Sequence, residues 1–223
     1  MDSNTVSPDV SSKMDIKDKI IKAYKEHILI HGTEPPSIFA FCKELGITED
    51  VFYEHFNTFE QVAASFWKEL FHNVAEEVKA EEGYTAYEAK EKLLTFFYAF
   101  FEALKPHRSF ALLSFKDSVS LLKRDSQHLS EMKKDFKLWA AELINEGIRK
   151  GEIAQRLRVT NAYDNILWLQ FMFLLNFWRK DGSHDFERTD AAIEKSVRFG
   201  FDLMEKNALD SAFDFGKFLF QDR

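Results

Sequence analysis

Two histidines are the first side chains whose types and spacing suggest chemistry. His27 and His31 are four residues apart in a segment with helical periodicity, so both imidazoles share one helix face, as in metal-binding helices. No third ligand is apparent beside them in the sequence. Cys42 is the single cysteine, which excludes an internal disulfide framework and a multi-cysteine zinc site. We therefore expect no metal and no other cofactor.

Motifs for catalysis are missing from the sequence. There is no Gly-rich phosphate-binding loop, no His-Glu-x-x-His, no Gly-x-Ser-x-Gly and no Cys-x-x-Cys. We accordingly expect no catalytic residues and a protein that is not an enzyme.

Composition favours helices. Among 223 residues there are only 8 glycines and 4 prolines, but 24 phenylalanines, which indicate large packing surfaces or an apolar cavity. The longest apolar run, Ile166 to Trp178, is shorter than the roughly 18 residues that a membrane span requires. The polar start of the chain lacks the apolar core of a signal peptide. We expect a cytoplasmic protein without a membrane partner.

Helix caps divide the chain into predicted elements. A polar tail, 1–14, precedes an amphipathic helix at 15–31 that Gly32 ends. Ser37 caps a helix at 38–45, Thr48 caps a third that runs to Phe56, and Thr58 caps a fourth that reaches about Glu82. Further helices are predicted at 85–104, 107–122, 129–149, 160–179, 187–206 and 209–221.

The first four helices resemble the DNA-binding head of the tetracycline-repressor (TetR) family. The matching motifs are Ile20-Ile21-x-Ala23 with Ile28 and Gly32, Ser37-Ile38-x-x-Phe41-Cys42-x-x-Leu45-Gly46, Ile47-Thr48-x-x-x-Phe52-Tyr53-x-His55-Phe56, and Thr58-x-Glu60-x-Val62. His27 stands where the family has a core leucine. The resemblance implies an all-α, dimeric protein with a helix-turn-helix domain at 15–60 and an antiparallel helical bundle for ligand binding and dimerisation at 61–223.

By the same resemblance, nine residues are expected to contact operator DNA: Lys17, Ser37, Thr48, Glu49, Asp50, Val51, Tyr53, His55 and Asn57. The charge departs from what DNA binding needs. Residues 13–60 hold six lysines against nine carboxylates, and phosphate neutralisation supplies most non-specific affinity. Phe39 and Asn57 also stand where the family tends to have polar or basic residues. Glu49 and Asp50 either accept hydrogen bonds from cytosine in the major groove or only stabilise the start of the helix through its dipole.

The helix at 160–179 is apolar nearly all round and must be covered on every side. We expect it to form a four-helix dimer interface with the helix at 187–206, through Trp168, Phe171, Met172, Leu175, Val197, Phe201 and Met204. The alternative is a monomer in which both are core helices.

An effector pocket is predicted in the larger domain. Its candidate residues are Phe97, Tyr98, Phe101, Trp139, Asn165 and Gln170. Each ring is equally explained by core packing, and each polar side chain by an interhelical hydrogen bond.

We predict a ligand-responsive transcription regulator, a repressor, that binds operator DNA as a homodimer and is released by a small apolar or aromatic effector. The alternative is a TetR-fold carrier of a hydrophobic ligand or lipid with weakened DNA binding. Trp178-x-x-Asp181 and Phe186-x-x-Thr189 resemble the C-terminal region of the ubiquinone-biosynthesis lipid-binding accessory proteins. A protein-interaction module is a third hypothesis. The amphipathic stretch 209–220 is expected to dock on its own domain rather than on a membrane.

Overall fold

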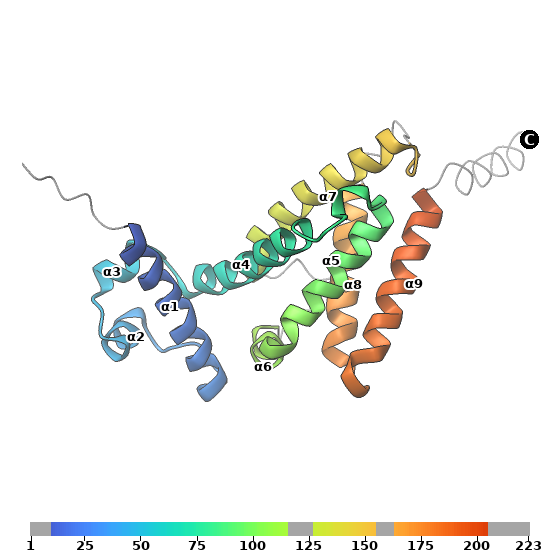
Figure 1. Ribbon diagram of the computed structural model, residues 1–223. Helices are drawn as coiled ribbons and strands as arrows, with labels where there is room; N and C mark the ends of the chain where they lie inside the picture. Colours follow the sequence, from blue (N-terminus) through green and yellow to red (C-terminus); the bar gives the residue numbers. More distant parts are fainter. Residues whose placement is uncertain (1–9, 116–126, 155–162, 205–223) are drawn as a thin grey trace, which may run out of the picture.

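The computed structural model describes residues 10–115, 127–154 and 163–204. In these ranges it contains helices and turns but no strand, which confirms the all-α class (Figure 1). The helices are α1 (Val10–His31), α2 (Ile38–Leu45), α3 (Glu49–Tyr53), α4 (Phe59–Lys79), α5 (Ala89–Leu104), α6 (Arg108–Ser114), α7 (Ser130–Lys150), α8 (Tyr163–Lys180) and α9 (Glu187–Met204). None of these helices is long and apolar enough to cross a membrane.

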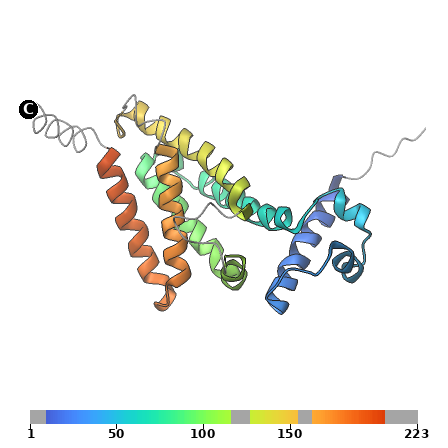
Figure 2. The same cartoon turned by 180° about the vertical axis from the view of Figure 1, so that it is seen from behind.

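Two helical bodies are joined by α4. The first, the head, contains α1 to α3, and the second, the body, contains α5 to α9; Figures 1 and 2 show α4 leading from one to the other. Each has its own buried apolar cluster, and the head cluster also takes in Phe110 from α6. The division of the chain at residue 60 remains a prediction.

Capping side chains set the helix starts in the head. The hydroxyl oxygens of Ser37, Thr48 and Thr58 accept hydrogen bonds from the N–H groups of the residues three positions on, at 3.1, 3.4 and 3.3 Å. Each of these hydroxyls satisfies a donor that the first helical turn would otherwise leave unpaired.

Several predicted boundaries were wrong. α1 begins at Val10 rather than residue 15. α3 ends at Tyr53 instead of Phe56, because the chain turns so that Phe56 packs inward on Phe52 before the Thr58 cap. A short 3₁₀ turn at Tyr84–Ala86 delays α5, which starts where the Glu91 carboxylate accepts from the Glu88 N–H. The predicted helix at 209–221, residues 116–122 of another and residues 1–9 of the tail lie outside the described ranges.

Phe171 is the centre of an aromatic cluster in the body. Its ring centroid lies 5.1 Å from Phe100, 5.5 Å from Phe136 and 5.3 Å from Trp168, and the side chain is fully buried. Phe97 and Phe101 stack on it from α5, each at 6.3 Å. The phenylalanines of α5 thus fill the interior of the body with ordinary core packing.

The prediction of which faces of α8 and α9 meet a second subunit was wrong. All seven expected interface residues are buried in the core of a single chain: Trp168, Phe171, Met172, Leu175, Val197, Phe201 and Met204. α5 and α7 cover them. An apolar surface of α8 and α9 does face solvent, but it consists of Ile166, Leu169, Phe173, Phe199 and Leu203. We call these five residues the outer α8–α9 face.

A buried carboxylate holds the turn between α8 and α9. Asp181 accepts hydrogen bonds from the N–H and hydroxyl of Ser183 (2.9 and 2.7 Å) and from those of Thr189 (2.9 and 2.7 Å). Although desolvation by burial raises the pKa of Asp181, these four hydrogen bonds outweigh it and hold the pKa at about 2. The carboxylate is therefore ionised at neutral pH.

Arg108 closes the same turn from α6. Its guanidinium donates to the carbonyl oxygens of Trp178 (2.9 Å) and Asp181 (2.9 Å) and lies over the rings of Trp178 and Phe186. The residues Trp178, Asp181, Phe186 and Thr189, which carried the resemblance to lipid-binding accessory proteins, thus have a structural role in this turn.

Candidate nucleic-acid interface

The turn between α2 and α3 has helix-turn-helix geometry. Gly46 adopts a left-handed conformation with φ of 74°, which a side chain would strain, and the Ile47 N–H donates to the Cys42 carbonyl at 3.0 Å. The buried rings of Phe41 and Phe52 meet edge to face at 6.1 Å. The turn and this ring contact hold α2 and α3 together as a helix-turn-helix.

Tyr53 is the most prominent side chain on the outer surface of α3. Its side chain is 48 % exposed, yet its ring packs edge-on against the fully buried Phe52 at 5.8 Å. A phenol held in this way presents its hydroxyl to the outside at little further entropic cost. Asp50 is exposed beside it, and Glu49, Val51 and His55 are partly exposed.

Ser37 and Thr48 are exposed at the starts of α2 and α3. Their oxygens accept the capping hydrogen bonds, so the hydroxyl hydrogens stay available to an acceptor outside the protein. At the start of α2, a phosphate oxygen would also meet the positive end of the helix dipole. Asn57 is exposed too, but its backbone N–H donates to the Gln61 side chain at 2.7 Å.

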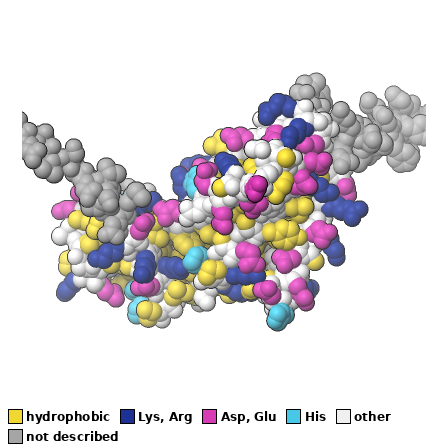
Figure 3. Space-filling view, in the orientation of Figure 1, with side chains coloured by type: hydrophobic (Ala, Val, Ile, Leu, Met, Phe, Trp, Pro, Cys, Tyr) yellow, Lys and Arg dark blue, Asp and Glu magenta, His cyan; other side chains and the backbone are white. Residues whose placement is uncertain are grey.

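The charge of the head does not form a basic patch on the face shown in Figure 3, where its lysines are interspersed with carboxylates. Lys17, a predicted phosphate contact, forms an ion pair with Glu69 of α4 at 2.5 Å. Lys43, which the prediction omitted, is exposed and lines a hollow of about 410 Å³ with Phe39 and Thr48. The sequence places Lys43 five residues before Thr48, but only the structure shows that both residues line one hollow.

A polar and aromatic seam joins the head to α6. Lys25 Nζ lies 2.7 Å from Nδ1 of His107, so the neutral imidazole accepts the hydrogen bond. Phe66 packs against His107 at 5.2 Å and Phe110 at 4.8 Å. Tyr24 packs on Phe110 from α1 at 6.5 Å. These contacts join α6 to α1 and α4.

We expect the free energy of unfolding to fall in acid because of His107 in this seam. Burial and the neighbouring Lys25 charge lower the pKa of His107 below its ordinary value of 6.5. Between that value and the lowered pKa the unfolded chain binds a proton that the folded chain does not, so stability falls as pH drops. Urea unfolding at pH 7.5 and 5.5 should show a smaller loss for His107→Gln than for the wild type. Some loss should remain, because burial also lowers the pKa of His128. Equal losses in both proteins would contradict the assignment.

The predicted effector residues do not come together in one site. Phe97, Phe101 and Trp139 are buried in the aromatic core, whereas Tyr98 and Asn165 are exposed. The Gln170 amide donates to the Ser196 hydroxyl at 3.1 Å and so joins α8 to α9. For Gln170 the interhelical hydrogen bond, the alternative considered above, is what the structure contains.

A hollow of about 680 Å³ lies on the outer α8–α9 face. Phe173, Phe177 and Phe199 line it together with Ala191, Ala192, Lys195, Ser196 and Arg188. An apolar surface of this kind, with a basic rim, is typical of a protein interface or a ligand groove.

Comparisons with known proteins agree with this architecture. Residues 92–219, more than half of the chain, match the family described as tetracyclin repressor-like, C-terminal domain. The chain belongs to the TetR family and has the fold of its transcription regulators. Among curated proteins, none matches the sequence significantly.

Several solved structures share the fold. The fatty acid degradation regulator FadR from Bacillus halodurans has a TM-score of 0.60 and 21% identity, over 83% of this chain and 94% of that one. A proposed TetR-family regulator from Shewanella sp. PV-4 has a TM-score of 0.57 and 16% identity, over 86% and 99%. A TetR-family regulatory protein from Rhodococcus RHA1 has a TM-score of 0.53 and 14% identity, over 86% and 98%.

Proposed function

We propose that this protein is a ligand-responsive transcription regulator that binds operator DNA as a homodimer. The observation that carries the proposal is Tyr53, which is exposed on α3 while its ring packs against Phe52 of an intact helix-turn-helix core. Lys43 and the hydroxyls of Ser37 and Thr48 would contact phosphates, while α3 enters the major groove. Lys17 would attract phosphate less strongly than a free lysine, because it already forms an ion pair with Glu69.

The outer α8–α9 face is the proposed subunit contact. Two copies of Leu169, Phe173 and Phe199 meeting across a two-fold axis would bury apolar side chains that otherwise face water. The dimer would place two α3 helices one helical turn of DNA apart, so the operator would be palindromic.

The proposed effector is a small, mainly apolar molecule that binds the body and releases DNA. The body is rich in aromatic side chains, and a structure of similar fold is that of a fatty acid degradation regulator. For this chain, a molecule with an acyl chain is therefore the first class to test. Binding would act through α6 and the Lys25–His107 seam, by favouring the conformation in which the two heads no longer match the operator.

DNA binding is tested by selecting genomic fragments from the source organism at low ionic strength and measuring affinity for an enriched fragment. We expect Tyr53→Ala to weaken binding by about tenfold, as for loss of one good base-edge or backbone contact. Tyr87→Ala, a partly exposed tyrosine before α5, is the matched control and should bind as the wild type does. A selection that enriches no fragment would overturn the regulator proposal.

A second candidate function is transport of a hydrophobic ligand by a head that has lost DNA binding. The pairing of Lys17 with Glu69 and the exposed Asp50 on α3 favour it, because both reduce attraction to phosphate. This function predicts a lipid that co-purifies with the protein and is identified by native mass spectrometry. A ligand-free protein that retains DNA at moderate salt would rule it out.

A further inference from the structure

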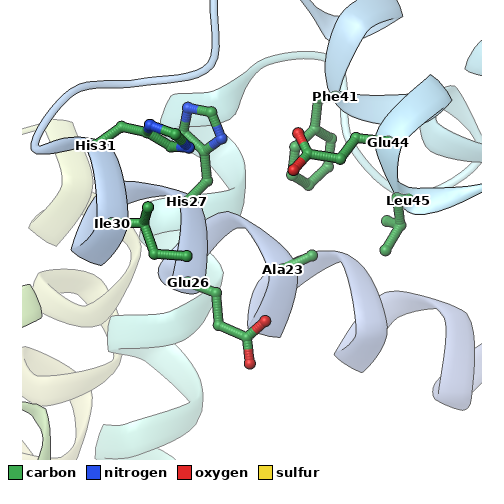
Figure 4. A pocket seen from close by; sticks show the side chains of 8 residues that line it. All are labelled: Ala23, Glu26, His27, Ile30, His31, Phe41, Glu44 and Leu45. Carbon is green, nitrogen blue, oxygen red and sulfur yellow. The ribbon is translucent and has the colours of Figure 1, made fainter.

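A hollow in the head has no part in the function proposed above. It lies between the second half of α1 and α2, has a volume of about 230 Å³ and is lined by Ala23, Glu26, His27, Ile30, His31, Phe41, Glu44 and Leu45 (Figure 4). Two imidazoles and a carboxylate therefore share one small surface depression with apolar walls. Imidazole nitrogens are ligands that zinc and copper ions favour.

The two imidazoles are close enough to act together. Successive turns of α1 bring the ring centroids of His27 and His31 to 4.3 Å, with the rings tilted by 41°. Side chains four residues apart on a helix share one face, which is the spacing by which two histidines of one helix bind a common metal ion.

Metal binding requires neutral imidazoles with a free lone pair, since protons and metal compete for the same ring nitrogens, so binding should be tested above the ordinary titration range of histidine.

Glu44 reaches the pair from α2. In Figure 4 its carboxylate points toward the His27 ring, whereas that of Glu26 points away. Within the described ranges no group of three or more His, Cys, Asp or Glu side chains is placed to hold a metal ion, so the two imidazoles would be the only protein ligands. Water would therefore fill the other coordination positions, and Glu44 would accept a hydrogen bond from a bound water and balance charge.

We propose that His27 and His31 bind one divalent transition-metal ion, such as Zn²⁺ or Cu²⁺, with Glu44 as an outer-sphere partner. Nitrogen ligands favour these ions over Mg²⁺ and Ca²⁺. The ion would join α1 to α2 and add positive charge to an acidic head. It would stabilise the folded chain, because the unfolded chain does not hold the two imidazoles together. The site does not depend on whether the head binds DNA.

The test is calorimetric titration of the tag-free full chain with ZnCl₂ at pH 7.5, and with CuCl₂ in a separate experiment. We expect one ion per chain, with affinity reduced at least about tenfold in His27→Ala and in His31→Ala, because two joined ligands bind far more tightly than one. Glu44→Gln should weaken binding less. His184→Ala removes an exposed histidine from the α8–α9 turn and is the matched control, with unchanged binding expected.

Thermal unfolding supplies a second measurement. Zn²⁺ should raise the unfolding temperature of the wild type and of His184→Ala, but not that of His27→Ala or His31→Ala. If either alanine variant fails to fold, the corresponding glutamine variant, His27→Gln or His31→Gln, is used instead, because glutamine is polar and similar in size to histidine. Binding in the His27 and His31 variants equal to that of the wild type, or no saturable binding by the wild type, would overturn the proposal.

Discussion

Replacing Leu169 and Phe199 together by glutamate is expected to convert the proposed dimer into a monomer. These side chains are 57 % and 64 % exposed in the single chain, and the proposed subunit contact would bury them. In a two-fold interface each substitution occurs twice, so four carboxylates would lose water without gaining partners. A buried, unpaired charge costs about 3–5 kcal/mol, which predicts a dimer dissociation constant raised by at least about a thousandfold.

Sedimentation equilibrium measures this change directly. Leu138→Glu is the matched control, because Leu138 is as exposed as Phe199 but lies on α7, away from the outer α8–α9 face. It should remain a dimer. The double variant should also bind a two-half-site operator much more weakly, since each monomer then binds alone. A double variant that stays dimeric would place the subunit contact elsewhere.

The largest expected effect on folding follows from Phe171→Ala. The ring contacts Phe97, Phe100, Phe136 and Trp168, and no solvent reaches it. Phe101 stacks on it as well, so deleting the ring removes apolar burial and leaves a cavity that five packed rings cannot easily collapse. We expect the free energy of unfolding to fall by about 3–5 kcal/mol.

Urea unfolding at a fixed protein concentration is the appropriate measurement, because the proposed dimerisation would make apparent stability depend on concentration. Phe39→Ala makes the same chemical change at a ring on α2 that is 62 % exposed, and should cost less than about 1 kcal/mol. A similarly small loss for Phe171→Ala would show that the aromatic cluster rearranges to fill the space.

Much of the head was predictable because its determinants are local. Ser37, Thr48 and Thr58 cap helices by hydrogen bonds to residues three positions away. The Gly46 turn likewise involves only neighbouring residues. In its small core Phe41, Cys42, Phe52 and Phe56 are buried, and Ile38, Leu45 and Ile47 pack against them.

The candidate interfaces were less predictable because their determinants are distant in the sequence. Lys17 pairs with Glu69, which is 52 residues away in the sequence, and Lys25 donates a hydrogen bond to His107, which is 82 residues away. In α8, which is apolar nearly all round, periodicity cannot tell the face that packs on α5 and α7 from the face left to a partner. The seven residues expected in the dimer contact are therefore core residues of the single chain.

The histidine pair illustrates the same division. Its spacing on one helix was fixed by the sequence, since a helical period determines which residues of a single helix share a face. The carboxylate that faces it comes from α2, and no pattern along α1 could indicate it. The sequence by itself determined the helices, their caps and the helix-turn-helix, all of which depend on short-range backbone geometry. Only the tertiary structure decided which charges are paired and which apolar face remains exposed, because helix packing brings those side chains together.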